Sequence, residues 1–203
     1  LLVYTLSPWN VDSLGDVLKA AEDHDLKLTF SMYSPTTSYL SKLDAGTEAD
    51  SKYFRLGPSM PPVIFSDDDL LRVRDAMDRA MQSHPGTVLF CDEYADLVTT
   101  PGPLFEMDPE TGLPLDCGSR IREPLRYFDG AGTSKQVKCC TPDVDCNHCR
   151  LYSGTWARLL RPTAQHLTDS TAFDGWLRMI DTIGHIFLYP YPFADSTEDA
   201  TIN

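Results

Sequence analysis

The chain has 203 residues, 42% hydrophobic and 23% charged, a composition that allows one soluble globular domain with a small appendage. Its formal net charge of −13 argues against binding nucleic acid through phosphates, because such binding needs clustered Lys and Arg. No apolar run approaches the roughly 20 residues of a membrane helix, and the start shows no signal peptide, so we expect a cytoplasmic protein without a membrane span.

The N-terminal segment has the pattern of a strand–helix–strand unit. Residues 1–6 form an apolar, β-prone run that starts at Leu1 and not at Met, which predicts further sequence upstream, since terminal residues are usually exposed. Asn10 is a predicted N-cap for a helix over residues 11–24, and residues 26–32 alternate as a second strand. Such a βαβ unit has a right-handed crossover and is the repeat of a parallel α/β sheet or barrel.

A long loop and a second helix follow this unit. Residues 34–65 are rich in Ser, Thr, Pro and Gly and are predicted to form the loop. Ser66 and the acidic run 67–69 start a helix that reaches Ser83, because negative charge suits the positive end of a helix. This electrostatic role explains the acidic run better than a metal site does. Residues 87–90 are a predicted short strand.

The composition changes after this strand. Residues 92–116 contain four prolines and are predicted to be a connector. Asp92 and Glu93 lie at its start and are better explained as solvated loop charges than as catalytic carboxylates, because no partner for them is identifiable.

A hairpin and two helices are predicted in the C-terminal half. Two extended runs, residues 120–128 and 134–140, flank a glycine-rich loop, which is typical of a β-hairpin. A helix starts near Ser153, and an amphipathic helix follows over residues 171–183. The tail from 196 to 203 is polar.

The cysteines are the most informative residues of the chain, because five of the six fall within 33 residues. These five are Cys117, Cys139, Cys140, Cys146 and Cys149. A Cys-x-x-Cys turn lets two sulfurs reach one metal centre, and the hairpin returns the chain so that Cys117 and one of the adjacent pair meet the same centre. Four converging thiolates hold Zn²⁺ or an iron–sulfur cluster.

Other interpretations of the cysteines differ in how well they fit. Disulfides are disfavoured, because the chain shows no secretory signal and is large enough to fold without them. Unrelated reduced cysteines do not explain the clustering in a Pro- and Gly-rich segment. A structural zinc ribbon stays open, since the number of ligands does not separate Zn²⁺ from a cluster. His148 lies between two candidate ligands and is either a hydrogen-bond donor to a cluster sulfide or a solvated loop histidine.

The order of these cysteines resembles the auxiliary-cluster extension of radical S-adenosylmethionine (SAM) enzymes, the SPASM or twitch domain. In that family a cysteine precedes a β-hairpin with a glycine in its turn, a second cysteine ends the hairpin, and later cysteines complete a 4Fe–4S site. Here the spacing from Gly130 or Gly132 to Cys139 is longer than in the family, so the turn carries an insertion. Cys139 is the favoured ligand of the adjacent pair and Cys140 the alternate. Residues 146–154 also resemble the C-terminal segment of hopanoid-type radical SAM enzymes.

The N-terminal part resembles the same family. Residues 1–33 are similar to the fifth strand, fifth helix and sixth strand of its partial (β/α)₆ barrel, including an asparagine, Asn10, just ahead of the helix. The Cys-x3-Cys-x2-Cys loop that binds the SAM-cleaving cluster does not occur in this sequence. The resemblance therefore implies part of a radical SAM enzyme, with the catalytic half of the parent upstream.

The resemblance implies a division of the α/β chain into four parts. Residues 1–90 would be part of the partial barrel, 91–116 a connector, 117–162 a small hairpin-plus-helix domain for the metal cluster, and 163–203 a C-terminal helix and tail. The implied cofactors are an auxiliary 4Fe–4S cluster here, and SAM with a second 4Fe–4S cluster in the intact parent, with zinc as the alternative to the auxiliary cluster.

The implied activity is radical modification of a substrate that the residues do not identify. SAM cleavage in the parent would yield a 5′-deoxyadenosyl radical, which abstracts a hydrogen from a small-molecule or peptide substrate. The electrons would come from a reductant such as ferredoxin or flavodoxin. Thr5, Ser31 and Tyr33 lie toward the carboxyl ends of the strands, where barrel active sites form, and are candidates to line a SAM or substrate pocket.

Overall fold

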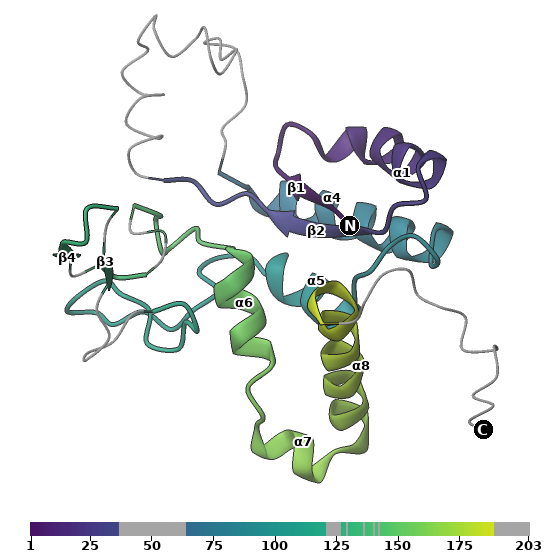
Figure 1. The fold of residues 1–203 in the computed structure, drawn as a ribbon. Helices are drawn as coiled ribbons and strands as arrows, with labels where there is room; N and C mark the ends of the chain where they lie inside the picture. The colour runs from purple at the N-terminus through teal and green to yellow at the C-terminus, as the bar shows by residue number, and fades with distance from the viewer. Residues whose placement is uncertain are drawn as a thin grey trace, which may run out of the picture.

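The computed structural model describes residues 1–36, 64–120, 127–128, 130–135, 137–139, 141 and 143–188, and it confirms the α/β class (Figure 1). The elements in chain order are β1 (Leu2–Leu6), η1 (Val11–Ser13), α1 (Leu14–Asp23), β2 (Leu28–Met32), α4 (Asp67–Ser83), α5 (Asp92–Val98), β3 (Tyr127–Phe128), β4 (Ser134–Lys135), α6 (Tyr152–Leu159), α7 (Ala164–Thr168) and α8 (Ser170–Phe187). Most of the predicted loop 34–65 and all of the tail 196–203 lie outside the described residues.

The predicted βαβ unit is present. β1 and β2 pair in parallel, in a register that runs from Leu2 opposite Leu28 to Leu6 opposite Met32, and α1 connects them. The predicted strand at residues 87–90 is reduced to one parallel bridge between Val88 and Leu28, because the chain turns into α5 at Cys91. The described residues therefore show a small parallel sheet and no barrel.

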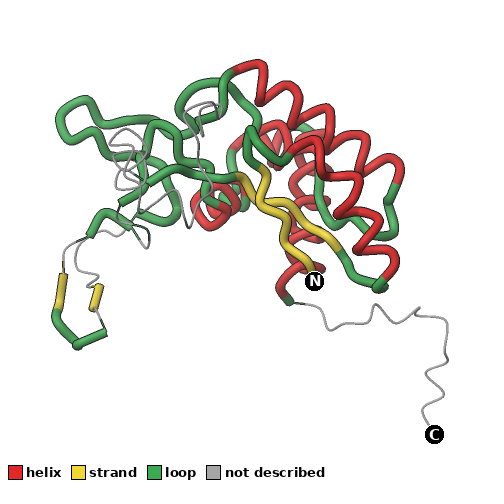
Figure 2. The backbone as a smooth tube through the Cα atoms, turned by 90° about the horizontal axis from the view of Figure 1, so that it is seen from above, coloured by secondary structure: helices red, strands yellow, loops and turns green. Residues whose placement is uncertain are grey.

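The main hydrophobic core lies against this sheet. Leu6, Phe30 and Met32 are buried on one face of the strands, and the core continues through α1, α4 and α5. Helices α1 and α4 also contact each other. Figure 2 shows the helices gathered around the parallel strands, with the loop-rich part of the chain set to one side.

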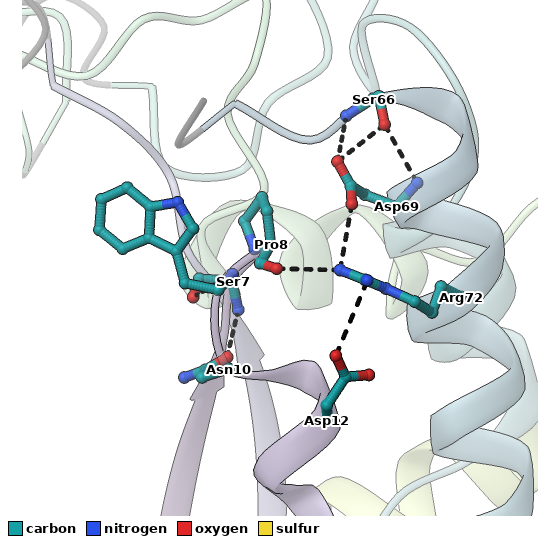
Figure 3. Close-up of polar contacts among 8 residues, drawn as sticks. Ser7, Pro8, Asn10, Asp12, Ser66, Asp69 and Arg72 are labelled. Atoms are coloured by element: carbon teal, nitrogen blue, oxygen red, sulfur yellow. Dashed lines mark hydrogen bonds and ion pairs between the residues drawn. The ribbon is translucent and has the colours of Figure 1, made fainter. Parts of the chain in front are cut away.

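The start of α4 follows the predicted electrostatic pattern and adds a capping box. The Ser66 hydroxyl accepts a hydrogen bond from the Asp69 amide, and the Asp69 carboxylate accepts one from the Ser66 amide. Arg72, one turn further on, donates to the Pro8 carbonyl at 2.9 Å and forms ion pairs with Asp69 and Asp12 (Figure 3). These contacts fix the loop after β1 against the first turns of α4.

Asn10 lies at the predicted N-cap position, but it does not cap the helix through its side chain. The residue does precede the helical segment, which starts as the 3-10 turn η1, but its side chain makes no cap hydrogen bond. Instead the side-chain Oδ1 of Asn10 accepts from the Ser7 backbone amide at 2.8 Å (Figure 3). The side-chain Nδ2 donates to the Thr5 backbone carbonyl at 2.9 Å. Asn10 therefore closes the turn at the carboxyl end of β1.

The segment predicted as a connector, residues 91–116, begins with a helix that the sequence did not predict, α5 at Asp92–Val98. The helix forms because Tyr94, Ala95 and Val98 are buried in the main core, while the prolines begin only after its end. Asp92 and Glu93 lie in its first turn, where acidic residues are favourable, and they pair with Arg74 and Arg178. Neither behaves as an unpaired loop charge.

The hairpin and the C-terminal helices are found where they were predicted. β3 and β4 are short and antiparallel, and an isolated bridge pairs Arg120 with Cys139 below them. α6 starts at Tyr152, next to the predicted start. α8 runs from Ser170 to Phe187 and is longer than predicted; the Asp169 carboxylate caps it by accepting from the amides of residues 171 and 172.

Among the described helices, none has both the length and the apolar character required to cross a lipid bilayer.

Candidate metal centre

Four cysteines from three segments of the chain line one cavity of about 20 Å³. They are Cys117, Cys139, Cys146 and Cys149. Cys117 precedes the hairpin, Cys139 ends it, and the other two form the predicted Cys-x-x-Cys turn. The structure therefore brings together the favoured set of cysteines, while Cys140 lies outside the described residues.

The thiols face the same cavity but do not meet at one point. Among the residues that the structure describes, no three His, Cys, Asp or Glu side chains are close enough together to hold a metal ion as they stand. The shared cavity is the more informative of these two observations, because rotation about the Cα–Cβ bond moves a sulfur without moving the backbone. None of the four sulfurs forms a disulfide.

The Cys-x-x-Cys turn is shaped by Asp145. One oxygen of its carboxylate accepts from the Asn147 amide at 3.0 Å, and the other lies 2.5 Å from Nδ1 of His148. Burial acts to raise the pKa of Asp145, but the hydrogen bonds from His148 and Asn147 outweigh it and lower that pKa. His148 is half exposed and bound to a carboxylate, which favours its interpretation as a loop histidine.

Two glycines allow α6 to pack directly against the first cysteine. A Cβ atom on Gly154 would lie 3.0 Å from the Cys117 sulfur, and one on Gly118 would lie 2.2 Å from the Ala157 Cβ. Glycine within a helix costs roughly 1 kcal/mol relative to alanine, so its presence inside α6 is itself a sign of close packing. Sequence reasoning missed both glycines, although the position of Gly154 in a helix was a usable signal.

The cavity lies in a second, smaller hydrophobic cluster. This cluster contains Leu104, Phe105, Val144, Cys139 and Cys149. Burial raises the pKa of Cys149 to about 11 and also raises that of Cys117. At neutral pH both are protonated thiols, so a metal that binds here displaces protons.

The sixth cysteine belongs to a different environment. Cys91 is buried in the main core at the N-terminus of α5 and does not line the cavity. Burial raises its pKa to about 12. It therefore serves as a matched control for the cysteines of the cavity.

The three residues predicted to line a SAM or substrate pocket lie close to one another at the end of the sheet. Thr5 and Ser31 face each other across β1 and β2 near the carboxyl ends of the strands, and the amide of Tyr33 donates to the Leu6 carbonyl just beyond them. Thr5 is exposed, while Ser31 and Tyr33 are half-buried. They lie on the face opposite Phe30, so the main core leaves this face uncovered at Thr5.

The end of β2 is hydrogen-bonded to the Cys-x-x-Cys turn. Thr36 forms an antiparallel bridge with Val144, and the Asp145 amide donates to the Pro35 carbonyl at 3.2 Å. The carboxyl end of the sheet and the cysteine cavity are therefore parts of one continuous structure.

The donor set fits a metal that prefers sulfur. Four cysteine sulfurs suit Zn²⁺ or an iron–sulfur cluster and are poor ligands for Mg²⁺ or Ca²⁺. The cavity, at about 20 Å³, is close to the roughly 10–15 Å³ that one water molecule needs. The volume of the cavity matches a single ion once the sulfurs rotate toward it, whereas a four-iron cluster also requires the four sulfurs to move apart.

No family model, curated protein or solved structure matches this chain. The case for a function therefore rests on the cysteine cavity, on its connection to the sheet and on the resemblance of the sequence pattern.

Proposed function

We propose that the chain is part of a radical SAM enzyme and binds an auxiliary 4Fe–4S cluster through Cys117, Cys139, Cys146 and Cys149. The observation that carries this proposal is that four cysteines, from a hairpin and a Cys-x-x-Cys turn, line one cavity. The order of these elements is that of the SPASM or twitch pattern.

The α/β region supports the partial-barrel part of the proposal. Across the sheet, β1 is paired with β2, and β2 is bridged at Leu28 to Val88, so the three segments are neighbours in chain order and all parallel. Right-handed crossovers in one direction place their helices on the same side, as in the arc of a barrel. The contact between α1 and α4 agrees with this arrangement. Thr5, Ser31 and Tyr33 would then lie at the end of the strands where a substrate or SAM binds.

The residues of the site also limit what such a cluster does. When bound, the cluster would supply electron transfer or structural support. Ligation by four cysteines occupies every iron, so substrate does not bind iron directly. The apolar cluster around Phe105 and Val144 keeps water away from the sulfurs, and the half-buried Arg120 and Lys138 place positive charge at the cavity wall. SAM cleavage itself requires a cluster site that this sequence does not contain.

A second candidate is a zinc-stabilised structural or interaction module. The size of the cavity favours it, because about 20 Å³ accommodates one ion once the sulfurs rotate toward it, whereas a four-iron cluster also requires them to move apart. Four-cysteine zinc sites are closed and structural, and they contribute to folding rather than to catalysis.

Anaerobic reconstitution distinguishes the two candidates. The chain is supplied with iron and sulfide, or with zinc, and then analysed for bound metal, sulfide and visible absorption. About four irons per chain with a broad charge-transfer absorption support the cluster. Loss of this signal in Cys146→Ser/Cys149→Ser, but not in Cys91→Ser, places the cluster in the cavity. One tightly held zinc and no stable cluster would support the structural module instead.

A further inference from the structure

Arg150 follows the last cysteine of the Cys-x-x-Cys turn and is only 5% exposed. Arginine is almost never fully buried unless its charge is paired, because removing a charge from water is costly. The buried position of Arg150 therefore requires an explanation from its surroundings.

The guanidinium group contacts three backbone carbonyls at the end of α5. Nη1 donates to Val98 at 2.7 Å, and Nη2 donates to Thr100 at 2.9 Å and to Gly102 at 3.2 Å. The backbone amide of Arg150 donates to the Ser34 hydroxyl at 2.8 Å, just beyond β2. The residue thus joins α5, the sheet end and the cysteine turn at one point.

These partners satisfy the hydrogen bonds of Arg150, but they are backbone carbonyls and not carboxylates that would neutralise its charge. In the described part of the chain, no carboxylate lies within ion-pair distance of its guanidinium. By contrast, Arg158 pairs with Asp116 at 3.3 Å, and Arg178 pairs with Glu93 at 2.7 Å. The carbonyls at a helix C-terminus carry only partial negative charge. Two groups lie within electrostatic reach of the guanidinium: the carboxylate of Asp67, which is exposed to solvent, and Cys149, which becomes anionic on binding a metal.

We propose that Arg150 is the buried counter-charge of the metal–thiolate centre, held in place by the carbonyls of α5. This inference rests on the proposed metal site. A divalent ion with four thiolates has a net charge of 2 − 4 = −2, and a 4Fe–4S core of charge +2 with four thiolates has the same net charge. In the apolar surroundings of the cavity, a fixed positive charge next to Cys149 stabilises this anion more than an exposed charge does. Arg150 is a positioning residue and does not ligate the metal.

The test is an anaerobic Co²⁺ titration of the full chain, since Co²⁺ bound by thiolates has a distinct charge-transfer spectrum. Arg150→Gln removes the charge, Arg150→Lys keeps it, and Arg158→Gln is the matched control, because Asp116 already neutralises Arg158. We expect Arg150→Gln to weaken Co²⁺ binding by about 10- to 100-fold, as residues next to metal ligands do. We expect Arg150→Lys to retain most of the affinity and Arg158→Gln to match the wild type.

The outcomes separate this inference from the proposed function. If the wild type gives no thiolate spectrum with Co²⁺, the metal site itself is wrong, and the role of Arg150 is wrong with it. If the wild type binds and a folded Arg150→Gln binds equally well, Arg150 only caps α5. If Arg150→Gln does not fold, Arg150→Lys decides: retained affinity supports the counter-charge, and lost affinity in a folded chain overturns it.

With a reconstituted cluster, the reduction potential gives an independent measurement. Removing a positive charge opposes the addition of an electron, so we expect a lower potential in Arg150→Gln. A tenfold change in the reduction equilibrium corresponds to about 59 mV for one electron. An unchanged potential would contradict the counter-charge role.

Discussion

The α/β region and the cysteine region are held together in different ways. In the α/β region, long apolar side chains are fully buried between a parallel strand pair and several helices, as for Phe30, Met77 and Tyr94. In the cysteine region, the apolar cluster is much smaller, and its hairpin strands have two residues each. Hydrophobic burial alone rarely stabilises so small a unit. The comparison supports the proposal that metal binding by the four cysteines stabilises the cysteine region.

The largest expected effect is a difference in metal dependence between the two regions. Structural zinc contributes about 10–16 kcal/mol of apparent binding free energy in small zinc domains. Binding of Zn²⁺ to the cysteines should therefore greatly slow amide hydrogen exchange in residues 104–119 and 143–151. The amides of β1, β2 and α4 should change little. Hydrogen exchange with and without Zn²⁺ measures this, and the double variant Cys146→Ser/Cys149→Ser is the control. Equal protection of both regions by metal would remove the distinction.

The next largest effect is expected where the two regions meet. Tyr94 of α5 stacks on Trp156 of α6 at a ring distance of 4.1 Å, and its hydroxyl is 2.7 Å from the Thr155 hydroxyl. Tyr94→Ala should lower the free energy of unfolding by about 3–5 kcal/mol. Tyr94→Phe removes only the hydrogen bond and should cost about 1 kcal/mol. Denaturant titration of the metal-free chain provides both values; a small loss in Tyr94→Ala would show that α6 is not part of the α/β core.

A smaller effect should be confined to the cysteine region. In Gly154→Ala, the added methyl group meets the Cys117 sulfur at 3.0 Å and displaces it, so metal affinity should fall about tenfold, in the range seen for residues around metal sites. Gly15→Ala in α1 is the matched control, because a Cβ atom at this position would have no other atom within 4 Å. This substitution should stabilise α1 by up to about 1 kcal/mol. Metal titration and thermal unfolding of both variants measure the contrast. Unchanged affinity in Gly154→Ala would mean that Cys117 is not a ligand.

The smallest effect is a dependence of stability on alkaline pH in the metal-free chain. Burial raises the pKa of Cys91 to about 12 from an ordinary value of 9.0, so the neutral thiol favours the folded state. This contribution is complete below pH 9.0 and is lost as the pH rises toward 12. Stability should therefore decrease above pH 9.0, and less steeply in Cys91→Ala. Urea titrations at several alkaline pH values measure the slope; identical slopes would show that Cys91 is not the group responsible.

The sequence predicts best those features that depend on neighbouring residues. The capping of α4 by Ser66, the βαβ unit and the Cys-x-x-Cys turn all follow from patterns within one segment. Helix α5 was missed because its short sequence lies beside a proline-rich stretch, and its stability comes from burying Tyr94 in a distant core. Local propensity is weaker than such tertiary packing.

The candidate site shows the same limit. The clustering and order of the cysteines indicate a metal centre, but the cavity wall depends on residues brought in from elsewhere. Gly154 is part of the site because it allows α6 to pack on Cys117. Arg150 is part of it because its guanidinium binds the carbonyls at the end of α5. Neither contact has a signal in the spacing of the cysteines. Only the three-dimensional arrangement reveals them.

The hydrogen bond between Ser34 and Arg150 closes a loop of 116 residues. Contacts between residues so far apart in the chain form slowly, because the entropy of closing a long loop is lost before the contact gives any energy in return. The end of β2 must already be in place when the cysteine turn docks on it. We therefore expect the proposed metal centre to assemble late in folding. A chain that meets metal earlier would bind it before the four cysteines have reached their final positions.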